Sequence, residues 1–326
     1  MLDTQELAAL ARFHENLLAV LSDVIIGQRE AVEHATSALL CNGHVLLTGG
    51  AASAKGLVAL SLSRALRLDF KRIQFTPDLM PSDITGSEVL DEDEASGRRV
   101  ARFAPGPIFT NILMADEINR TPPKTQAALL EGMQERQVTA GGETRPLPKP
   151  FFVIATKTNI ETDGTYPLPE AQQDRFMLNV EMGTLSEDEE LEVVLKDPAS
   201  NLGHIEPILD GARLGAFQRL VREVTVPTEV QRFIVNLTSA SRPGTPDAGE
   251  AVNKYVAWGA GVRATQYLAL GAKARAALDG RPEATVRDVR SVALPVMRHR
   301  IGVNFLAEND GVTSADIVAQ LLESVS

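Results

Sequence analysis

Cysteine, aromatic residues and long apolar runs are all scarce in this chain of 326 residues. The single cysteine, Cys41, cannot form an internal disulfide, which excludes a secreted scaffold held together by disulfides. It precedes a predicted strand, and we expect it to be a small buried side chain. Aromatic residues make up only 5% of the chain, so its cores must be built from aliphatic residues. This favours helices and parallel strands over an aromatic-rich β-sandwich.

The chain also lacks an excess of basic residues. Its 32 lysines and arginines stand against 43 acids, and the net charge of −11 argues against a protein that mainly coats nucleic acid. No apolar run approaches about 18 residues, so no membrane-spanning helix is predicted. The first residues have an amphipathic helical pattern instead of the pattern of a signal peptide. We therefore expect a cytoplasmic protein without a membrane segment.

Strand and helix patterns alternate through the first half of the chain. The predicted strands lie at 44–49, 69–76, 108–118 and 145–157, with helical patterns between them, and the segment 170–183 closes the series. This alternation predicts a three-layer α/β fold with a parallel sheet. Ser186 then begins a helix with Glu189 three residues later, which is a capping box, and the pattern stays helical to the end. We predict an α/β core over residues 1–185 and an all-helical lid domain over 186–326.

A loop of small residues follows the strand at 44–49. Gly49 opens it and Lys55 closes it at the spacing of a phosphate-binding loop, in which backbone N–H groups and a helix N-terminus face anionic oxygens. Gly56 stands where such loops carry a serine or threonine hydroxyl that binds Mg²⁺. Taken alone, the segment is also compatible with a turn that binds nothing. The residues between Gly49 and Lys55 are Gly50, Ala51, Ala52, Ser53 and Ala54.

Two acids, Asp116 and Glu117, follow the apolar strand that ends some 60 residues after this loop. Because the carboxyl ends of parallel strands meet at one edge of a sheet, we expect both carboxylates to lie beside the loop. An aspartate that organises Mg²⁺ and a glutamate that activates water require this placement. An ordinary surface acidic pair is the alternative.

From about residue 24 to its end, the chain resembles the MoxR family of AAA+ ATPases. The blocks that carry the resemblance are FTPDLMPSDITG at 75–86, the long segment at 106–139, and GTYPLPEAQQDRF at 164–176. The resemblance implies ATP or ADP and Mg²⁺ as cofactors, and a homo- or hetero-oligomeric ring, usually a hexamer, with ATP between subunits. It further implies a chaperone-like remodeller of protein complexes, often paired with a von Willebrand factor A-domain protein.

The resemblance also assigns roles to individual residues. It makes Lys55 the phosphate-loop lysine, Asp116 the magnesium-organising acid and Glu117 the catalytic base. Arg175 corresponds to the arginine finger, which reaches the γ-phosphate bound by the neighbouring subunit. For this arginine, a structural salt bridge is the alternative.

Three further positions follow from the same resemblance. Arg263 corresponds to the arginine of the lid, although a solvated arginine at a helix start explains it as well. Ile26 and Gly27 lie in the segment that borders the adenine.

The chain departs from the family pattern at two places. Gly56 removes the hydroxyl that helps to hold Mg²⁺. After the strand FFVIAT, Thr158 occupies the position of an asparagine that places the attacking water, and Asn159 follows one residue later. We count Asn159 among the candidate catalytic residues, although a shift of one residue at a strand end turns a side chain to the other face.

Both departures affect hydrolysis more than binding, and three functions remain open. The first is a MoxR-type ATPase that binds ATP and hydrolyses it weakly. The second is a pseudo-ATPase that acts as a ring or scaffold subunit. The third, a nucleic-acid remodeller, is disfavoured by the net charge of −11.

Two further segments lie outside this site: one is rich in charged residues and the other has the pattern of a hairpin. Residues 85–105 form a charged insertion that is either a solvated loop or a contact for a partner. Residues 137–147 contain Gly141-Gly142, a good turn signal, and predict a structural hairpin.

Overall fold

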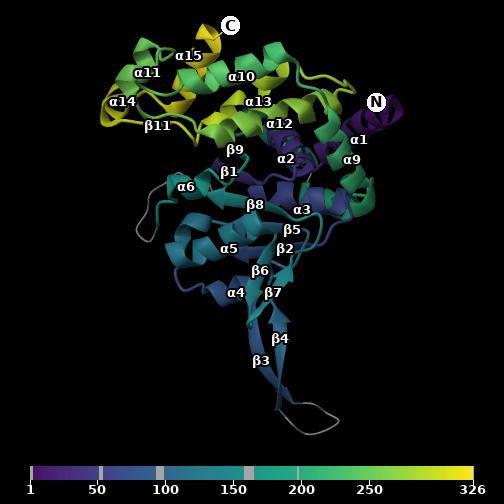
Figure 1. Ribbon diagram of the computed structural model, residues 1–326. Coiled ribbons are helices and arrows are strands. Elements are labelled where there is room, and N and C mark those ends of the chain that lie inside the picture. Colours follow the sequence, from purple (N-terminus) through teal and green to yellow (C-terminus); the bar gives the residue numbers. More distant parts are fainter. Residues whose placement is uncertain (1–2, 51–53, 93–98, 158–164, 197, 326) are drawn as a thin grey trace.

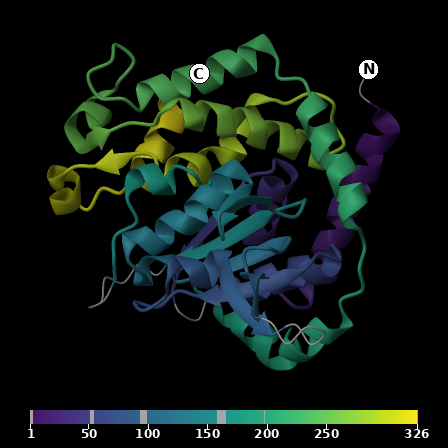
Figure 2. The same ribbon diagram turned by 60° about the horizontal axis from the view of Figure 1, so that its bottom comes forward.

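The structure is a computed structural model that describes residues 3–50, 54–92, 99–157, 165–196 and 198–325. A layer of helices lies at the top in Figure 1, a parallel sheet lies below it, and a long hairpin projects at the bottom. Figure 2, turned so that this bottom comes forward, shows the sheet beneath the same helical layer. Among the described residues, every helix is too short or too polar to span a bilayer.

The central sheet has five parallel strands in the order β2-β5-β8-β1-β9. Alternate side chains point to opposite faces, so Val45 and Leu47 enter one apolar core while Leu46 enters the other. Both faces are therefore covered, which explains the nearly continuous apolar runs in the sequence. The strands are β1 (Val45–Gly49), β2 (Phe70–Gln74), β5 (Ile112–Asp116), β8 (Phe152–Lys157) and β9 (Leu178–Met182).

Helices pack on both faces of this sheet, which confirms the predicted three-layer fold. Cys41, at the end of α2, is buried as expected, and burial raises the pKa of its thiol to about 12. Within α5, proline occupies the first helical turn, where the missing N–H has no intrahelical partner. The helices of this half are α1 (Thr4–Ser22), α2 (Arg29–Leu40), α3 (Lys55–Ala65), α4 (Pro81–Thr85), α5 (Pro123–Glu135) and α6 (Glu170–Gln173), with a 3-10 turn at Ile118–Arg120.

Two antiparallel hairpins extend from the sheet domain. The charged insertion is a hairpin of β3 (Gly86–Glu92) and β4 (Arg99–Pro105), which forms the projection at the bottom of Figure 1. The second is formed by β6 (Gln137–Ala140) and β7 (Glu143–Pro146). Its tip is Gly141-Gly142, and both glycines have positive φ, as the turn signal predicted.

The second half of the chain is helical, as predicted, with one exception. A strand at 256–258 interrupts the helical pattern expected there and pairs with a second short strand. A Cβ on Gly302 would overlap the ring of Trp258, so glycine permits this pairing. The helices are α7 (Glu187–Lys196), α8 (Pro198–Asn201), α9 (Gly211–Glu223), α10 (Thr228–Ala240), α11 (Glu250–Tyr255), α12 (Val262–Leu278), α13 (Val286–Met297), α14 (Phe305–Asp310) and α15 (Ser314–Ser324); a 3-10 turn lies at Leu202–His204 and the strands are β10 (Val256–Trp258) and β11 (Gly302–Val303).

Arg300, just after α13, connects the helical half to the sheet half. Its buried guanidinium donates to Asp174 Oδ1 (2.7 Å) and to the carbonyl oxygens of Asp174 (2.9 Å), Phe176 (2.6 Å) and Met177 (3.2 Å). These acceptors belong to the segment that leads into β9. One apolar cluster also runs without a break from a face of the sheet into the helices of the second half. The two halves therefore share a core.

His44, at the start of β1, should make stability depend on pH. The Val153 N–H donates to its Nδ1 (3.0 Å), so Nε2 carries the proton and donates to the Met133 carbonyl (3.2 Å). Burial, aided by the charge of Arg136, lowers the pKa of His44 well below its usual range. The unfolded chain therefore binds more protons than the folded chain below about pH 6.5.

We expect the free energy of unfolding to fall as the pH drops from 7 toward 5, with His44 contributing up to about 1.4 kcal/mol per pH unit. Urea unfolding at several pH values measures this slope. His44→Gln should reduce the slope, whereas His204→Gln, at an exposed position, should leave it unchanged. An unchanged slope in His44→Gln would contradict the assignment.

Candidate functional site

The predicted phosphate loop lies at the carboxyl edge of the sheet. β1 ends at Gly49 and α3 begins at Lys55, so the loop joins a buried strand to a helix N-terminus. The buried Lys55 ammonium donates to the carbonyl oxygens of Gly49 (2.9 Å) and Gly50 (2.6 Å). Ala54, directly before the helix, has a left-handed backbone with φ 52°. The lysine therefore lies within the loop and not in bulk solvent.

The structure brings Lys55 together with the two predicted acids. Asp116 is the last residue of β5, and Glu117 follows it at the same edge. Burial lowers the pKa of Lys55, and the negative charges of Asp116 and Glu117 oppose this shift. A cation and two carboxylates thus share one partly desolvated region, as the sequence predicted from strand ends alone.

Asp116 is held by two side chains that the sequence did not single out. The Thr156 hydroxyl on β8 donates to Oδ1 (2.6 Å), and the Arg72 guanidinium on β2 donates to Oδ2. Asp116 is only 9% exposed. Both oxygens of the candidate metal-organising carboxylate are therefore already engaged, and one of them by a cation.

Glu117 is positioned through its backbone and its carboxylate. Its φ is 56°, an uncommon value for a residue with a side chain, and its N–H donates to the Thr156 hydroxyl (2.8 Å). Its Oε2 accepts from Gln74 (2.6 Å) and Arg120 (3.0 Å). Thr156 therefore links both acids, and the left-handed turn directs the glutamate away from the strand direction. Thr156 ends the apolar run FFVIAT, which is the only sequence signal for it.

Gly56 lies in the first turn of α3, close to the same strand. A Cβ built there would meet the methyl group of Met114 at 3.4 Å and its sulfur at 3.6 Å, which are ordinary van der Waals distances. Apart from the chain neighbours and the backbone of its own helix, no other heavy atom of the described residues approaches within 4 Å. The position therefore has room for a small side chain, and the missing hydroxyl is not a steric requirement of this fold.

Ile26 and Gly27 pack against the start of the second half of the chain. Gly27 has φ 69°, and a Cβ there would collide with the side chains of Leu185 and Glu189. Ile26 is 7% exposed, and Gln28 next to them donates to the Gly183 carbonyl (3.0 Å). The segment thus joins the two halves, and its predicted contact with adenine stays a prediction.

Arg175 and Arg263 lie at the opposite edge of the sheet from Lys55. Both line a cavity of about 180 Å³ together with His44, the residue before the first residue of β1. Lys55 lies beyond the last residue of β1, at the other end of that strand. A strand of five residues spans roughly 15 Å, so the two arginines are about that far from the loop. Arg263 donates to Asp174 Oδ2 (2.9 Å), whose other oxygen binds Arg300. The two arginines therefore lie close to each other and far from the phosphate loop of the same chain.

Five predicted positions lie outside the described residues. These are Ala51, Ala52 and Ser53 of the loop, and Thr158 and Asn159 after β8. Among the residues that are described, no three His, Cys, Asp or Glu side chains gather into a possible metal centre. Loops of this kind hold Mg²⁺ with one or two protein groups and the phosphates of the nucleotide.

Comparisons with known proteins identify the family to which this chain is similar. Residues 44–178 match the ATPase family associated with various cellular activities (AAA), and residues 248–321 match the AAA lid domain. The chain is 36% identical to chaperone MoxR1 of Mycobacterium tuberculosis over 98% of this chain and 84% of the relative. It is 29% identical to protein MoxR of Methylorubrum extorquens over 97% of this chain and 93% of the relative.

The fold agrees with a solved structure over nearly its whole length. The crystal structure of a candidate ATPase from Cytophaga hutchinsonii superposes with a TM-score of 0.90 at 35% identity, and the match covers 99% of this chain and 97% of the other. The described fold, including the helical half, is therefore shared with an experimentally determined relative.

Proposed function

This chain belongs to the MoxR family of AAA+ ATPases, and from that premise we propose that it is a nucleotide-binding subunit of a protein-remodelling ring with weak ATP hydrolysis. The observation that carries the proposal is the division of the site. Lys55, Asp116 and Glu117 share one edge of the sheet, while Arg175 and Arg263 share the other. Neither edge alone carries all the residues of the predicted ATPase site.

Nucleotide binding is supported by the loop itself. The small residues described, the helix N-terminus of α3 and the buried Lys55 fit the phosphates of ATP or ADP. Family members use nucleotide and Mg²⁺, and Asp116 is the residue that would orient the metal here. ATP then supplies the free energy for remodelling.

Weak hydrolysis is supported by two features of the site. Gly56 offers no hydroxyl to Mg²⁺, and Asp116 gives one carboxylate oxygen to Arg72. Metal binding there requires Arg72 to move or to share the carboxylate. Glu117 remains placed to hold the attacking water. The same two features favour the second candidate, a pseudo-ATPase that serves as a ring or scaffold subunit.

Ring formation is supported by the position of the two arginines. A guanidinium that lies about 15 Å from its own phosphate loop serves a site on another subunit if it contacts nucleotide at all. We propose a hexamer that works with a von Willebrand factor A-domain protein in the cytoplasm, as the family resemblance implies. We also place the domain boundary near residue 185, between β9 and α7.

Calorimetric titration with ATP, with and without Mg²⁺, tests the proposal. Lys55→Ala should weaken binding about tenfold or more, because a charge-assisted contact to phosphate contributes about 1.5–3 kcal/mol. Lys124→Ala, an exposed lysine on α5, should bind as the unaltered protein does. Equal affinity in both variants would contradict a nucleotide site at Lys55.

Phosphate release separates the two candidates. The unaltered chain should release phosphate slowly but faster than Glu117→Gln. Equal rates, together with retained ATP binding, would favour the pseudo-ATPase.

A further inference from the structure

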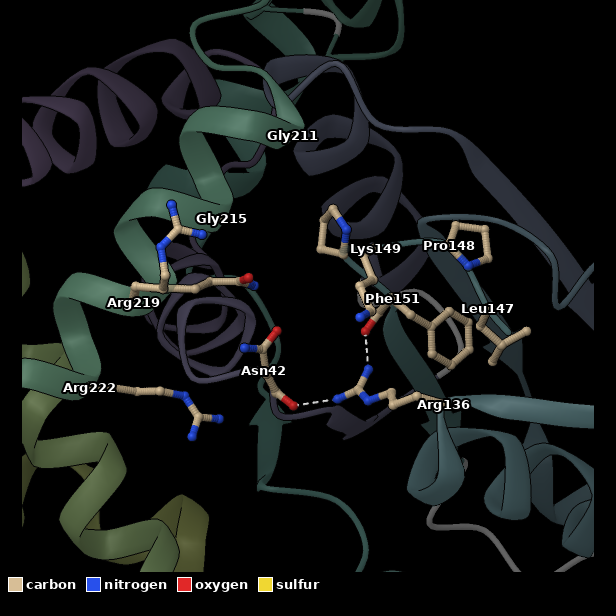
Figure 3. Close-up of a pocket in the computed structure, with 12 residues that line it drawn as sticks. Asn42, Arg136, Leu147, Pro148, Lys149, Phe151, Gly211, Gly215, Arg219 and Arg222 are labelled. Atoms are coloured by element: carbon tan, nitrogen blue, oxygen red, sulfur yellow. Dashed lines mark hydrogen bonds between the residues drawn. The ribbon is translucent and has the colours of Figure 1, made fainter. Parts of the chain in front are cut away.

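A second cavity lies at the amino edge of the sheet, away from the phosphate loop. It has a volume of about 430 Å³, which is within the range of small-molecule sites. Figure 3 shows Arg219 and Arg222 of α9 on one side of it, and Lys149, Phe151 and Arg136 on the other. The walls thus come from the helical half and from the segment before β8.

The lining of this cavity is strongly cationic. It contains Arg136, Lys149, Arg219 and Arg222 and no aspartate or glutamate, in a chain whose net charge is −11. Lys149, Arg219 and Arg222 are exposed and form no salt bridge with any described residue. Unpaired cations around a concave site attract anions by focusing the local field.

Arg136 fixes one cation at the base of the cavity. Its backbone is left-handed at the end of α5, with φ 56°. Its guanidinium donates to the carbonyl oxygens of Asn42 and Phe151 and lies 5.8 Å from the centroid of the Phe151 ring. Because Arg136 has five N–H donors, these two bonds leave others for a ligand. The charge is therefore held in place before any ligand arrives.

Two glycines on α9 leave the space open. Gly211 and Gly215 are one turn apart on the face that carries Arg219. Among the described residues, and leaving aside the backbone of its own helix, a Cβ at Gly215 would meet the Arg219 guanidinium alone, at 3.8 Å, so packing does not require glycine there. Glycine is a poor helix former, and its presence at 215 is explained by the volume that it leaves vacant.

We propose that this cavity binds a small phosphate ester. The phosphate would contact the arginines on α9, with Lys149 on the opposite wall, because a guanidinium can bind phosphate oxygens through two parallel N–H donors. The remainder of the ligand lies against the apolar wall formed by Leu147, Pro148, Pro150 and Phe151. This site is separate from the one at Lys55, which occupies the other edge of the sheet. Nothing in the proposal depends on ATP hydrolysis.

Titration with phenyl phosphate and with inorganic phosphate, at constant ionic strength, tests the proposal. Phenyl phosphate should bind saturably, and more tightly than inorganic phosphate because of the apolar wall. Arg222→Ala should weaken phenyl phosphate binding about tenfold or more. Gly215→Leu should abolish binding by filling the cavity while the melting temperature is retained, which separates binding from folding.

Two matched controls make the result specific. Arg232→Ala removes an exposed arginine on α10, and Lys55→Ala disables the phosphate loop; both should bind phenyl phosphate as the unaltered chain does. Loss of binding in Lys55→Ala would assign the ligand to the phosphate loop and overturn the proposal. Equal losses of phenyl phosphate affinity in Arg232→Ala and Arg222→Ala would show that binding is general charge attraction, and this would also overturn the proposal.

Two other outcomes would also overturn it. The first is the absence of saturable phenyl phosphate binding. The second is dissociation of an assembly by Arg219→Glu, seen by analytical ultracentrifugation, with phenyl phosphate binding unchanged. That result would make the cavity an interface between chains.

Discussion

Gly56→Ser is expected to raise Mg²⁺-dependent ATP hydrolysis about 10²-fold, the usual effect of one preorganised polar group in a catalytic site. The serine hydroxyl would stand one residue after Lys55, in the position from which such loops hold the metal. The structure gives it room, since outside its own helix the nearest atom to a Cβ at this position is the Met114 methyl at 3.4 Å. Phosphate release as a function of Mg²⁺ concentration measures the effect.

Gly56→Ala is the matched control for this gain. It adds the same Cβ and improves helix propensity more than serine does, without the hydroxyl. A rise in the serine variant alone assigns the gain to metal binding. If alanine and serine raise the rate equally, helix stability is the cause and the interpretation of Gly56 is wrong. If neither changes the rate, Arg72 on Asp116 or the segment after β8 limits hydrolysis.

The second large effect concerns stability. Arg300→Met should lower the free energy of unfolding by about 3 kcal/mol, because it removes the buried arginine of an ion pair and one donor from each of several carbonyl oxygens. The Arg300 side chain is 2% exposed, and its acceptors include the Asp174 carboxylate and the main-chain oxygens of residues 174, 176 and 177. Urea unfolding monitored by circular dichroism measures the loss.

Arg287→Met provides the comparison, because this exposed arginine lies on the neighbouring helix α13. It should change stability by less than about 0.5 kcal/mol. Arg300→Lys should recover only part of the loss, since an ammonium cannot reproduce the planar fork of donors. Similar losses at Arg287 and Arg300 would show that the bonds to the segment before β9 contribute little.

The elements that could be predicted are those with local or periodic signals. Buried parallel strands are nearly continuous apolar runs, and β1, β5 and β8 lie where such runs predicted them. The capping box at the start of α7 is present, with the Ser186 N–H donating to Glu189 Oε2 at 2.7 Å. The meeting of Lys55 with Asp116 and Glu117 followed from strand ends, because parallel strands end at a common edge.

Contacts between distant segments could not be predicted in the same way. Arg72 reaches Asp116 only because β2 lies next to β5, and this neighbour relation depends on strand order. The pairing of β10 with β11 joins residues some 45 positions apart and overrides a local helical pattern. The cavity beside α9 combines Arg136 with Arg219 across the two halves of the chain, so no single stretch of sequence indicates it.

The placement of the two arginines at the edge opposite Lys55 affects how a measured ATPase rate should be interpreted. In the proposed ring, a complete site would combine the loop of one chain with the arginines of the next, so the catalytic unit would be a junction between two chains and not a single polypeptide. The specific activity of a dilute sample would then report the fraction of chains that have neighbours. An altered chain would then affect the two junctions in which it takes part. A substitution could change the loop half of a site or the arginine half without changing the other.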